Sequence, residues 1–298
     1  MPLRLNPRQG RTSLNILLSV ALCLACFDSI FSAPGSTAPA DGLREQPSAW
    51  YALTGGRVVV RPGEVLDNAT IVIRDRRIVA VGSDVKPRAG ARRIDLTGKT
   101  VYAGFIDLFT EADVDGDPPG PKHWNKKMTP QLAASASYQS DAALDESLRR
   151  QGFAARLVVP KQGVIKGTSC LALTDGKPAT ESLLIRQAAL HMKLTVAFTW
   201  GGNNIHYPNS PMGAVALARQ AMLDAVWRRD VAAAAAADAT TPLPEANLAL
   251  ERLAECLDGQ RLVIAEASNE LFVLRADQFA REFALRLAVR GSGNEYRR

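Results

Sequence analysis

An acidic run follows the apolar segment GFIDLF, where the chain reads EADVDGD. Its carboxylates are Glu111, Asp113, Asp115 and Asp117. Oxygen donors of this kind suit a hard cation such as Ca²⁺. The run is not an EF-hand, because Pro118 stands where that loop needs glycine and Trp124 stands where it needs a bidentate glutamate. A solvated loop is the simpler prediction, and a cation site shared with Glu266, at the end of another predicted strand, is the alternative.

The three histidines of the chain lack the spacing of a metal site. His123 and His206 lie in predicted loops, and His191 lies at a predicted junction between a helix and a strand. None has a histidine partner in a His-x-His or His-x3-His pattern, the spacings that place two ring nitrogens on one metal. We therefore predict surface or hydrogen-bonding roles for all three.

The segment VIKGTSC, residues 164–170, contains the Gly, Lys and Thr of phosphate-binding loops but not their order, so it predicts a turn beside a strand. Ser169 and Cys170 would need a neighbouring base to act as nucleophiles, and no pattern supplies one. Cys170 and Cys256 have no metal-site spacing and are predicted to be small buried hydrophobic residues.

Residues 1–40 are predicted to be a signal peptide and leader. A basic start precedes the apolar run LNILLSVALCLACF, which small residues and prolines follow. The run is too short for a membrane span of about 20 residues. Cleavage after Ala33, Gly35 or Ala40 would export the protein to a periplasmic, secreted or cell-envelope location, and lipidation at Cys26 is an alternative.

The rest of the chain is predicted to be globular and close to neutral. Hydrophobic residues make up 47% of the 298 residues, enough for a sizeable core. Much of the net charge of +6 lies at the two ends, so no nucleic-acid partner is predicted.

Residues 41–100 form a predicted small β-domain. Apolar and polar residues alternate in TIVIRD and RRIVAVG, and the two residues Asp75 and Arg76 between them indicate a β-hairpin with one buried face.

Residues 101–298 alternate strands with helices, which indicates an α/β fold with a parallel sheet. Ser140 is the predicted cap of the first helix, and Gly152 its stop. The segment LTVAFTW is predicted to be a strand of an excursion, and the six alanines Ala232–Ala237 are predicted to end a long helix. The four predicted main strands are residues 101–109, 153–159, 261–265 and 285–289.

The hairpin followed by RRIDLTGKTVYAGFIDL resembles the entry into the barrel of the amidohydrolase superfamily. Later segments, among them GFAARLVVP and YPNSPMGAVALARQ, are similar to imidazolonepropionase- and dihydroorotase-like members. The resemblance implies a (β/α)8 barrel, a TIM-type fold, with its site at the C-terminal strand ends. It also implies zinc-assisted hydrolysis of C–N bonds in small substrates.

Members of that family take two metal ligands from a His-x-His after the first strand, and here Phe109 and Glu111 stand at those positions. The strand-end residues that remain as weak candidates are Glu266, Asn294 and Glu295. The resemblance therefore implies zinc in intact members but predicts no metal, cofactor or catalytic residue in this chain.

About four main strands are half of the eight that a closed barrel needs, so we expect an incomplete barrel and a truncated chain. Two hypotheses follow from the sequence. The first is an amidohydrolase-like hydrolase that is inactive as given, associated with a complementary barrel half or a second amidohydrolase module. The second is a non-catalytic binding or scaffolding module that kept the fold.

Overall fold

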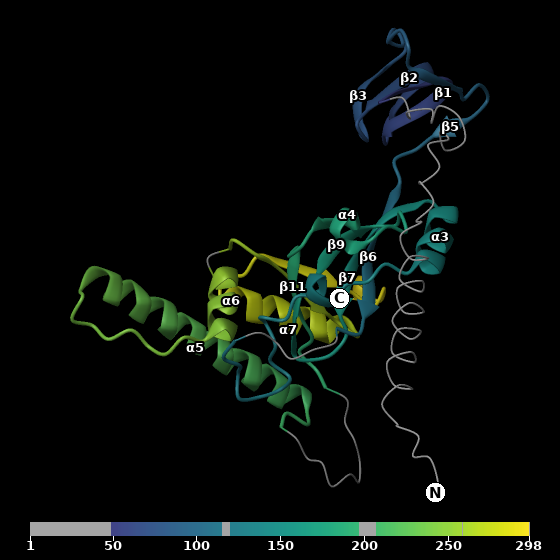
Figure 1. Cartoon of the computed structure of the whole chain (residues 1–298). Coiled ribbons are helices and arrows are strands. Elements are labelled where there is room, and N and C mark those ends of the chain that lie inside the picture. The colour runs from purple at the N-terminus through teal and green to yellow at the C-terminus, as the bar shows by residue number, and fades with distance from the viewer. Residues whose placement is uncertain (1–48, 115–119, 197–206, 258, 298) are drawn as a thin grey trace, which may run out of the picture. The chain divides into compact units, whose positions relative to one another are not determined.

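The computed structural model describes residues 49–114, 120–196, 207–257 and 259–297 (Figure 1). It divides the chain into two compact units, with the division between Tyr102 and Ala103. The predicted signal peptide and leader, Asp115, Asp117 and His206 lie outside the described residues. Among the residues that are described, no helix has both the length and the apolar character needed to cross a membrane.

The first unit is a five-stranded sheet in the order β3-β2-β1-β4, with β5 also paired to β1. Its strands are β1 (Trp50–Arg61), β2 (Glu64–Arg74), β3 (Arg77–Gly82), β4 (Arg92–Asp95) and β5 (Thr100–Val101). Asp75 and Arg76 connect β2 to β3 with φ angles of 48° and 64°, the left-handed conformation that a two-residue hairpin turn requires. The predicted hairpin is therefore confirmed.

The second unit contains two four-stranded sheets, in the orders β10-β9-β7-β6 and β13-β12-β11-β8. Parallel pairing joins β6 to β7, β11 to β12 and β12 to β13. The strands are β6 (Phe105–Ala112), β7 (Phe153–Pro160), β8 (Ile165–Thr168), β9 (Cys170–Leu173), β10 (Leu183–Ile185), β11 (Ala189–Met192), β12 (Leu262–Glu266) and β13 (Leu287–Arg290). This is a mixed α/β arrangement.

Three predictions about these strands were wrong. The segment 164–170 is not a turn but contains β8 and the start of β9, and His191 lies inside β11 rather than at a junction. The parallel strand β11 is thus additional to the four predicted main strands. Residues 194–196 of LTVAFTW are not a strand, and residues 197–200 of that segment lie outside the described residues. Runs of four residues carry too little periodicity to fix strand positions from the sequence.

The longer helices of the second unit were predicted from the sequence, whereas its two four-residue helices were not. The helices are α2 (Ala134–Ser137), α3 (Ala142–Arg150), α4 (Ala179–Ser182), α5 (Pro211–Ala237), α6 (Leu248–Leu257), α7 (Glu270–Glu282) and the 3-10 helix η1 (Glu295–Arg297). The cap of α3 is Asp141 rather than Ser140, because the Asp141 carboxylate accepts from the backbone N–H groups of Ala143 and Leu144. Ser140 instead donates to Asp145 at 2.8 Å.

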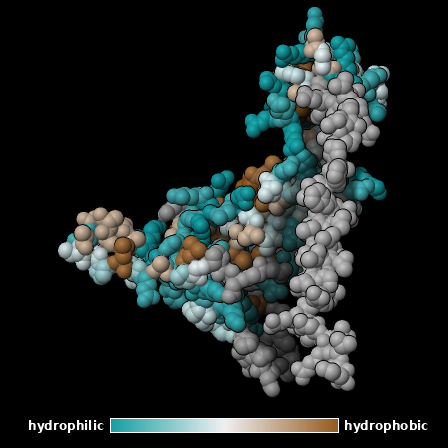
Figure 2. Space-filling model, in the orientation of Figure 1, coloured by the Kyte–Doolittle hydropathy of each residue, from teal (hydrophilic) through white to brown (hydrophobic). Residues whose placement is uncertain are grey.

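The main hydrophobic core lies between the β13-β12-β11-β8 sheet and helices α5, α6 and α7 (Figure 1). Leu190 and Val263 contribute from the strands, Leu217 and Leu253 from α5 and α6, and Phe279 from α7. These side chains are 3% exposed or less. Figure 2 shows that apolar side chains also remain on the surface among polar ones. The core fixes the strands whose other face carries the charged residues described below.

Gly167 in β8 marks a close approach of two backbone segments. Its φ is +108°, and a Cβ atom there would lie 2.4 Å from the carbonyl oxygen of Leu132. The backbone N–H of the next residue, Thr168, donates to that same carbonyl at 2.7 Å. Only glycine fits this position without moving β8 away from the Leu132 backbone.

We therefore expect Gly167→Ala to destabilise the second unit by roughly 2–4 kcal/mol, because backbone strain and a backbone clash add together. The control is Gly259→Ala, which has a positive φ of +68° but no atom within 4 Å of the new Cβ. It should cost about 1 kcal/mol. Urea denaturation followed by circular dichroism measures both, and equal losses would contradict the close approach.

Candidate functional site

A buried ammonium group lies between two carboxylates at the ends of three strands. The Lys166 Nζ is 2.5 Å from Glu266 Oε1 and 3.0 Å from Glu111 Oε1. The Lys166 side chain is 1% exposed and that of Glu266 is 5% exposed, whereas that of Glu111 is 40% exposed. We call Glu111, Lys166 and Glu266 the strand-end triad.

The triad joins strands that are far apart in the sequence. Glu111 comes from the C-terminal end of β6, Lys166 from β8 and Glu266 from the last position of β12. β8 and β12 flank β11 on its two edges, so β11 fixes the sheet that carries both Lys166 and Glu266. β6 belongs to the other sheet. The Lys166–Glu111 hydrogen bond, 55 positions apart in the chain, therefore links the two sheets of the second unit.

Phe109 packs beside the triad where the family resemblance implies a histidine. Its ring centroid lies 5.8 Å from Lys166 Nζ and 5.9 Å from the His191 ring. The Arg290 guanidinium lies over the same ring at 4.0 Å. Arg290 ends β13 and pairs in register with Glu266. The aromatic ring is thus in contact range of two cations, an arrangement stabilised by attraction to the π-face.

His191 is fully buried and neither ring nitrogen has a hydrogen-bond partner in the described structure. Burial, with a smaller contribution from the Lys166 charge, lowers the pKa of His191 to about 3. Both effects disfavour the imidazolium form. The ring is therefore neutral at physiological pH, and it packs against Phe109 rather than pairing with a carboxylate.

The residues at this position do not fit the zinc that the resemblance implies. Phe109 has no donor atom, and the oxygens of Glu111 and Glu266 already face a cation. A divalent ion between the same carboxylates would meet the Lys166 ammonium at close range, where like charges repel strongly in a low-dielectric environment. Within the described residues, no three His, Cys, Asp or Glu side chains are grouped as metal ligands.

Of the sequence candidates, Glu266 and Glu111 join the triad, whereas Asn294 and Glu295 lie in a local turn after β13. The Glu295 carboxylate accepts from the backbone N–H groups of Ser292 and Gly293 at 2.5 and 2.9 Å. The Ser292 bond contributes most to lowering the pKa of Glu295. The Asn294 backbone N–H donates to the Ser292 hydroxyl at 3.4 Å.

Asp113, the other described carboxylate of the acidic run, pairs with Lys161 at 3.5 Å on the surface. The alternative for this run was a cation site shared with Glu266. Glu111 and Glu266 do approach the same point, but the cation between them is the ammonium group of Lys166.

The possible nucleophiles are buried and unactivated. Burial raises the pKa of Cys170 to about 11 and that of Cys256 to about 12, so both are neutral thiols, and the two are not bonded to each other. The prediction that they are small buried residues is confirmed. Ser169 is fully buried and donates to the Ala189 carbonyl at 3.3 Å.

His123 is also mostly buried, and its Nδ1 accepts from the Asn125 backbone N–H at 3.1 Å.

Lys166 and Arg290 were missed as site residues. Lys166 lies between Ile165 and Gly167 in a segment that the sequence indicates to be a turn, where a lysine is ordinarily solvated. The available signal was the placement of a single charge, Lys166, in GVIKGTSCLAL, which is compatible with a buried strand that carries a paired lysine.

The chain was compared with protein families, curated sequences and solved structures. No protein-family model matches the chain. It is 27% identical to a dihydroorotase of Anaeromyxobacter dehalogenans strain 2CP-C over 166 residues, which cover 46% of this chain and 37% of the relative. A dihydroorotase of Anaeromyxobacter sp. strain K is 26% identical over the same length. The match thus covers well under two thirds of these curated relatives.

A solved amidohydrolase from Thermotoga maritima MSB8 is similar in structure, with a TM-score of 0.64 and 18% sequence identity. The similarity covers 80% of this chain and 63% of that one. With the dihydroorotase matches, it establishes a relationship to the amidohydrolase superfamily that is divergent and partial. The resemblance predicted from the sequence is confirmed at this level.

Removing the buried cation should be costly. We expect Lys166→Met to lower the free energy of unfolding by about 3–5 kcal/mol, because Glu266 would be left buried and unpaired. Lys166→Met combined with Glu266→Gln should recover part of that loss, since no uncompensated buried charge remains. Urea denaturation of the two variants provides the measurement.

The control for this pair is Lys177→Met, which removes a solvent-exposed ion pair with Glu181 and should cost less than about 1 kcal/mol. A Lys166→Met variant as stable as this control would contradict the buried triad, and so would a double variant less stable than Lys166→Met.

The low pKa of His191 predicts a stability loss in acid. The unfolded chain binds a proton near the ordinary pKa of about 6.5, while the folded protein resists protonation down to about 3. The stabilisation that the neutral ring provides is therefore fully present above about pH 6.5, and it is lost as the pH falls from about 6.5 towards about 3. Between pH 6.5 and pH 5 the loss should approach about 2 kcal/mol.

We expect His191→Phe to remove this contribution, so that its free energy of unfolding falls less steeply between pH 6.5 and pH 5 than that of the parent protein. Denaturation curves at several pH values measure the slopes. Parallel slopes for the two proteins would show that His191 is protonated normally in the folded state.

Proposed function

We propose that this chain is an amidohydrolase-like module that does not hydrolyse C–N bonds through a metal and instead serves as a non-catalytic binding or scaffolding module. The observation that carries the proposal is the position of the Lys166 ammonium, 2.5 Å from Glu266 and 3.0 Å from Glu111. The family resemblance implies a metal close to these two residues. Here a side chain of the protein supplies the positive charge.

The chemistry of the triad supports this proposal. An ammonium can neutralise two carboxylates and donate hydrogen bonds to them, but it has no empty coordination position to polarise a substrate carbonyl or to acidify a water molecule. The two rings that pack beside the triad, those of Phe109 and His191, are both uncharged. Cys170 is a neutral thiol and Ser169 donates to a backbone carbonyl rather than to a base, so neither supplies a substitute nucleophile.

The dihydroorotase matches favour a second candidate, a hydrolase of C–N bonds in small or cyclic substrates that works with zinc. In that case the catalytic residues would come from elsewhere, through a complementary barrel half or a second amidohydrolase module.

Two observations are compatible with such a partner. β6 has β7 as its one strand neighbour in the described structure, and Ile106 and Leu108 of β6 are 50% and 71% exposed. Export through the N-terminal segment is part of both proposals.

Metal analysis of the purified protein distinguishes the two candidates. After incubation with zinc and removal of the free ion, we expect far less than one zinc per chain by mass spectrometry and no hydrolysis of dihydroorotate. Stoichiometric zinc together with hydrolysis that a chelator abolishes would refute the non-catalytic proposal.

The matched variant combines Phe109→His, Glu111→His and Lys166→Met, which restores the His-x-His pattern and removes the ammonium. We expect this variant to bind zinc more tightly than the parent, seen as a rise in melting temperature on addition of zinc. The same small zinc response in both proteins would show that the ammonium does not decide metal binding.

A further inference from the structure

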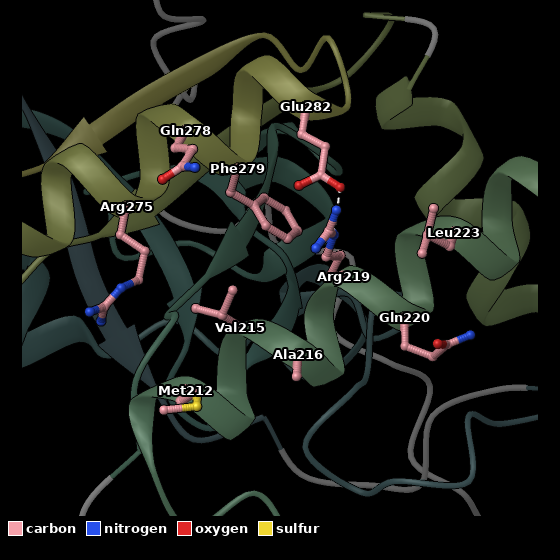
Figure 3. A pocket seen from close by; sticks show the side chains of 10 residues that line it. All are labelled: Met212, Val215, Ala216, Arg219, Gln220, Leu223, Arg275, Gln278, Phe279 and Glu282. Carbon is pink, nitrogen blue, oxygen red and sulfur yellow. Dashed lines mark hydrogen bonds and ion pairs between the residues drawn. The ribbon is translucent and has the colours of Figure 1, made fainter.

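A surface hollow of about 680 Å³ lies between helices α5 and α7 (Figure 3). The two helices run in the same direction along its sides, and the aromatic ring of Phe279 points into it from α7. Its lining residues are Met212, Val215, Ala216, Arg219, Gln220 and Leu223 from α5, and Arg275, Gln278, Phe279 and Glu282 from α7. The hollow is separate from the strand-end triad, with which it shares no residue.

Helix α5 carries apolar residues on two faces, although only one faces the core. Leu217 and Met222 are buried against the sheet, whereas Met212 is 82% exposed and Leu223 is 47% exposed beside the hollow. A surface helix of a globular protein ordinarily has one apolar stripe and one polar face. A helix that is apolar on a second face is typical of one that packs on both sides. The second face of α5 therefore has the character of an interface.

The charges along the hollow are not balanced. Arg219 and Glu282 form an ion pair at 2.6 Å, drawn as a dashed line in Figure 3, and so neutralise each other. Arg275 has no carboxylate partner in the described structure, and its Nη1 is buried without a hydrogen-bond partner. Its guanidinium lies 4.5 Å from the Phe272 ring centroid. One uncompensated cation beside an apolar surface favours an occupant that brings a carboxylate.

The dimensions of the hollow suit a helix. Met212 and Leu223 are separated by about three helical turns, or roughly 16 Å along α5 at 1.5 Å per residue. An amphipathic helix packs its apolar face into such a groove through residues spaced three and four apart. We propose that the α5–α7 groove binds an acidic amphipathic helix of a partner protein, whose apolar face covers Met212 and Leu223 and whose carboxylate pairs with Arg275. This inference goes beyond the proposed function, because it does not depend on the metal status of the triad.

The test uses two fluorescein-labelled synthetic helices on the purified full chain. Both peptides carry leucines spaced three and four apart, and they differ at one position beside the leucine stripe, which is Glu in the first and Lys in the second. Fluorescence anisotropy measures their affinities. We expect the Glu peptide to bind the parent protein about tenfold more tightly than the Lys peptide. Arg275→Glu should reverse that preference.

Two further variants separate the groove from general surface effects. Leu223→Asp places a charge in the apolar wall and should weaken both peptides by at least about tenfold, while its exposed position leaves folding intact, as a melting curve verifies. Arg286→Glu makes the same charge change as Arg275→Glu at an exposed residue outside the groove and should leave both affinities unchanged.

Absence of binding by either peptide would overturn the proposal. Equal binding of the Glu and Lys peptides to the parent protein would do so as well, as would unchanged binding to Leu223→Asp. Because these readouts do not involve zinc, their failure is distinguishable from failure of the non-catalytic proposal.

Discussion

The Lys166 ammonium between Glu111 and Glu266 is the interaction on which the strand ends of the second unit depend. Two carboxylates that close to one another would repel without a cation between them, and burial of Glu266 makes the repulsion more costly. Lys166 offsets both effects and joins β6 of one sheet to β8 and β12 of the other. Beside it, His191 is fully buried and Phe109 is half-buried, whereas Glu111 keeps 40% of its side chain exposed.

Under the proposed non-catalytic function, this arrangement accounts for an amidohydrolase-like fold without the metal ligands that the family resemblance implies. In a metal site the ion holds the surrounding carboxylates together and provides the chemistry. The ammonium group can do the first of these but not the second. Glycine at position 167, immediately after the lysine, allows β8 to approach the Leu132 backbone closely.

The helices and longer strands were largely predictable from local pattern. The 27 residues of α5 follow from continuous helix-forming residues ended near the alanine run, and the β2–β3 hairpin follows from alternation around a two-residue turn. β8 and β11 were not predictable in this way. Each has four residues, all buried, so the polar residues Lys166, Thr168 and His191 do not mark a solvent-facing side. Because these two strands were not predicted, Lys166 was not recognised as a site residue and His191 was assigned to the wrong position.

The sequence by itself determined the relationship to the amidohydrolase superfamily and the absence of a His-x-His pair, because both are properties of contiguous residues around GFIDLFTE. Only the tertiary structure decided which side chains Glu111, at one of those two positions, contacts. Glu111, Lys166 and Glu266 are separated by 55 positions or more along the chain, and no local pattern indicates that they meet. Their contact arises from the pairing of strands in two sheets, which the packed core of α5, α6 and α7 holds in place.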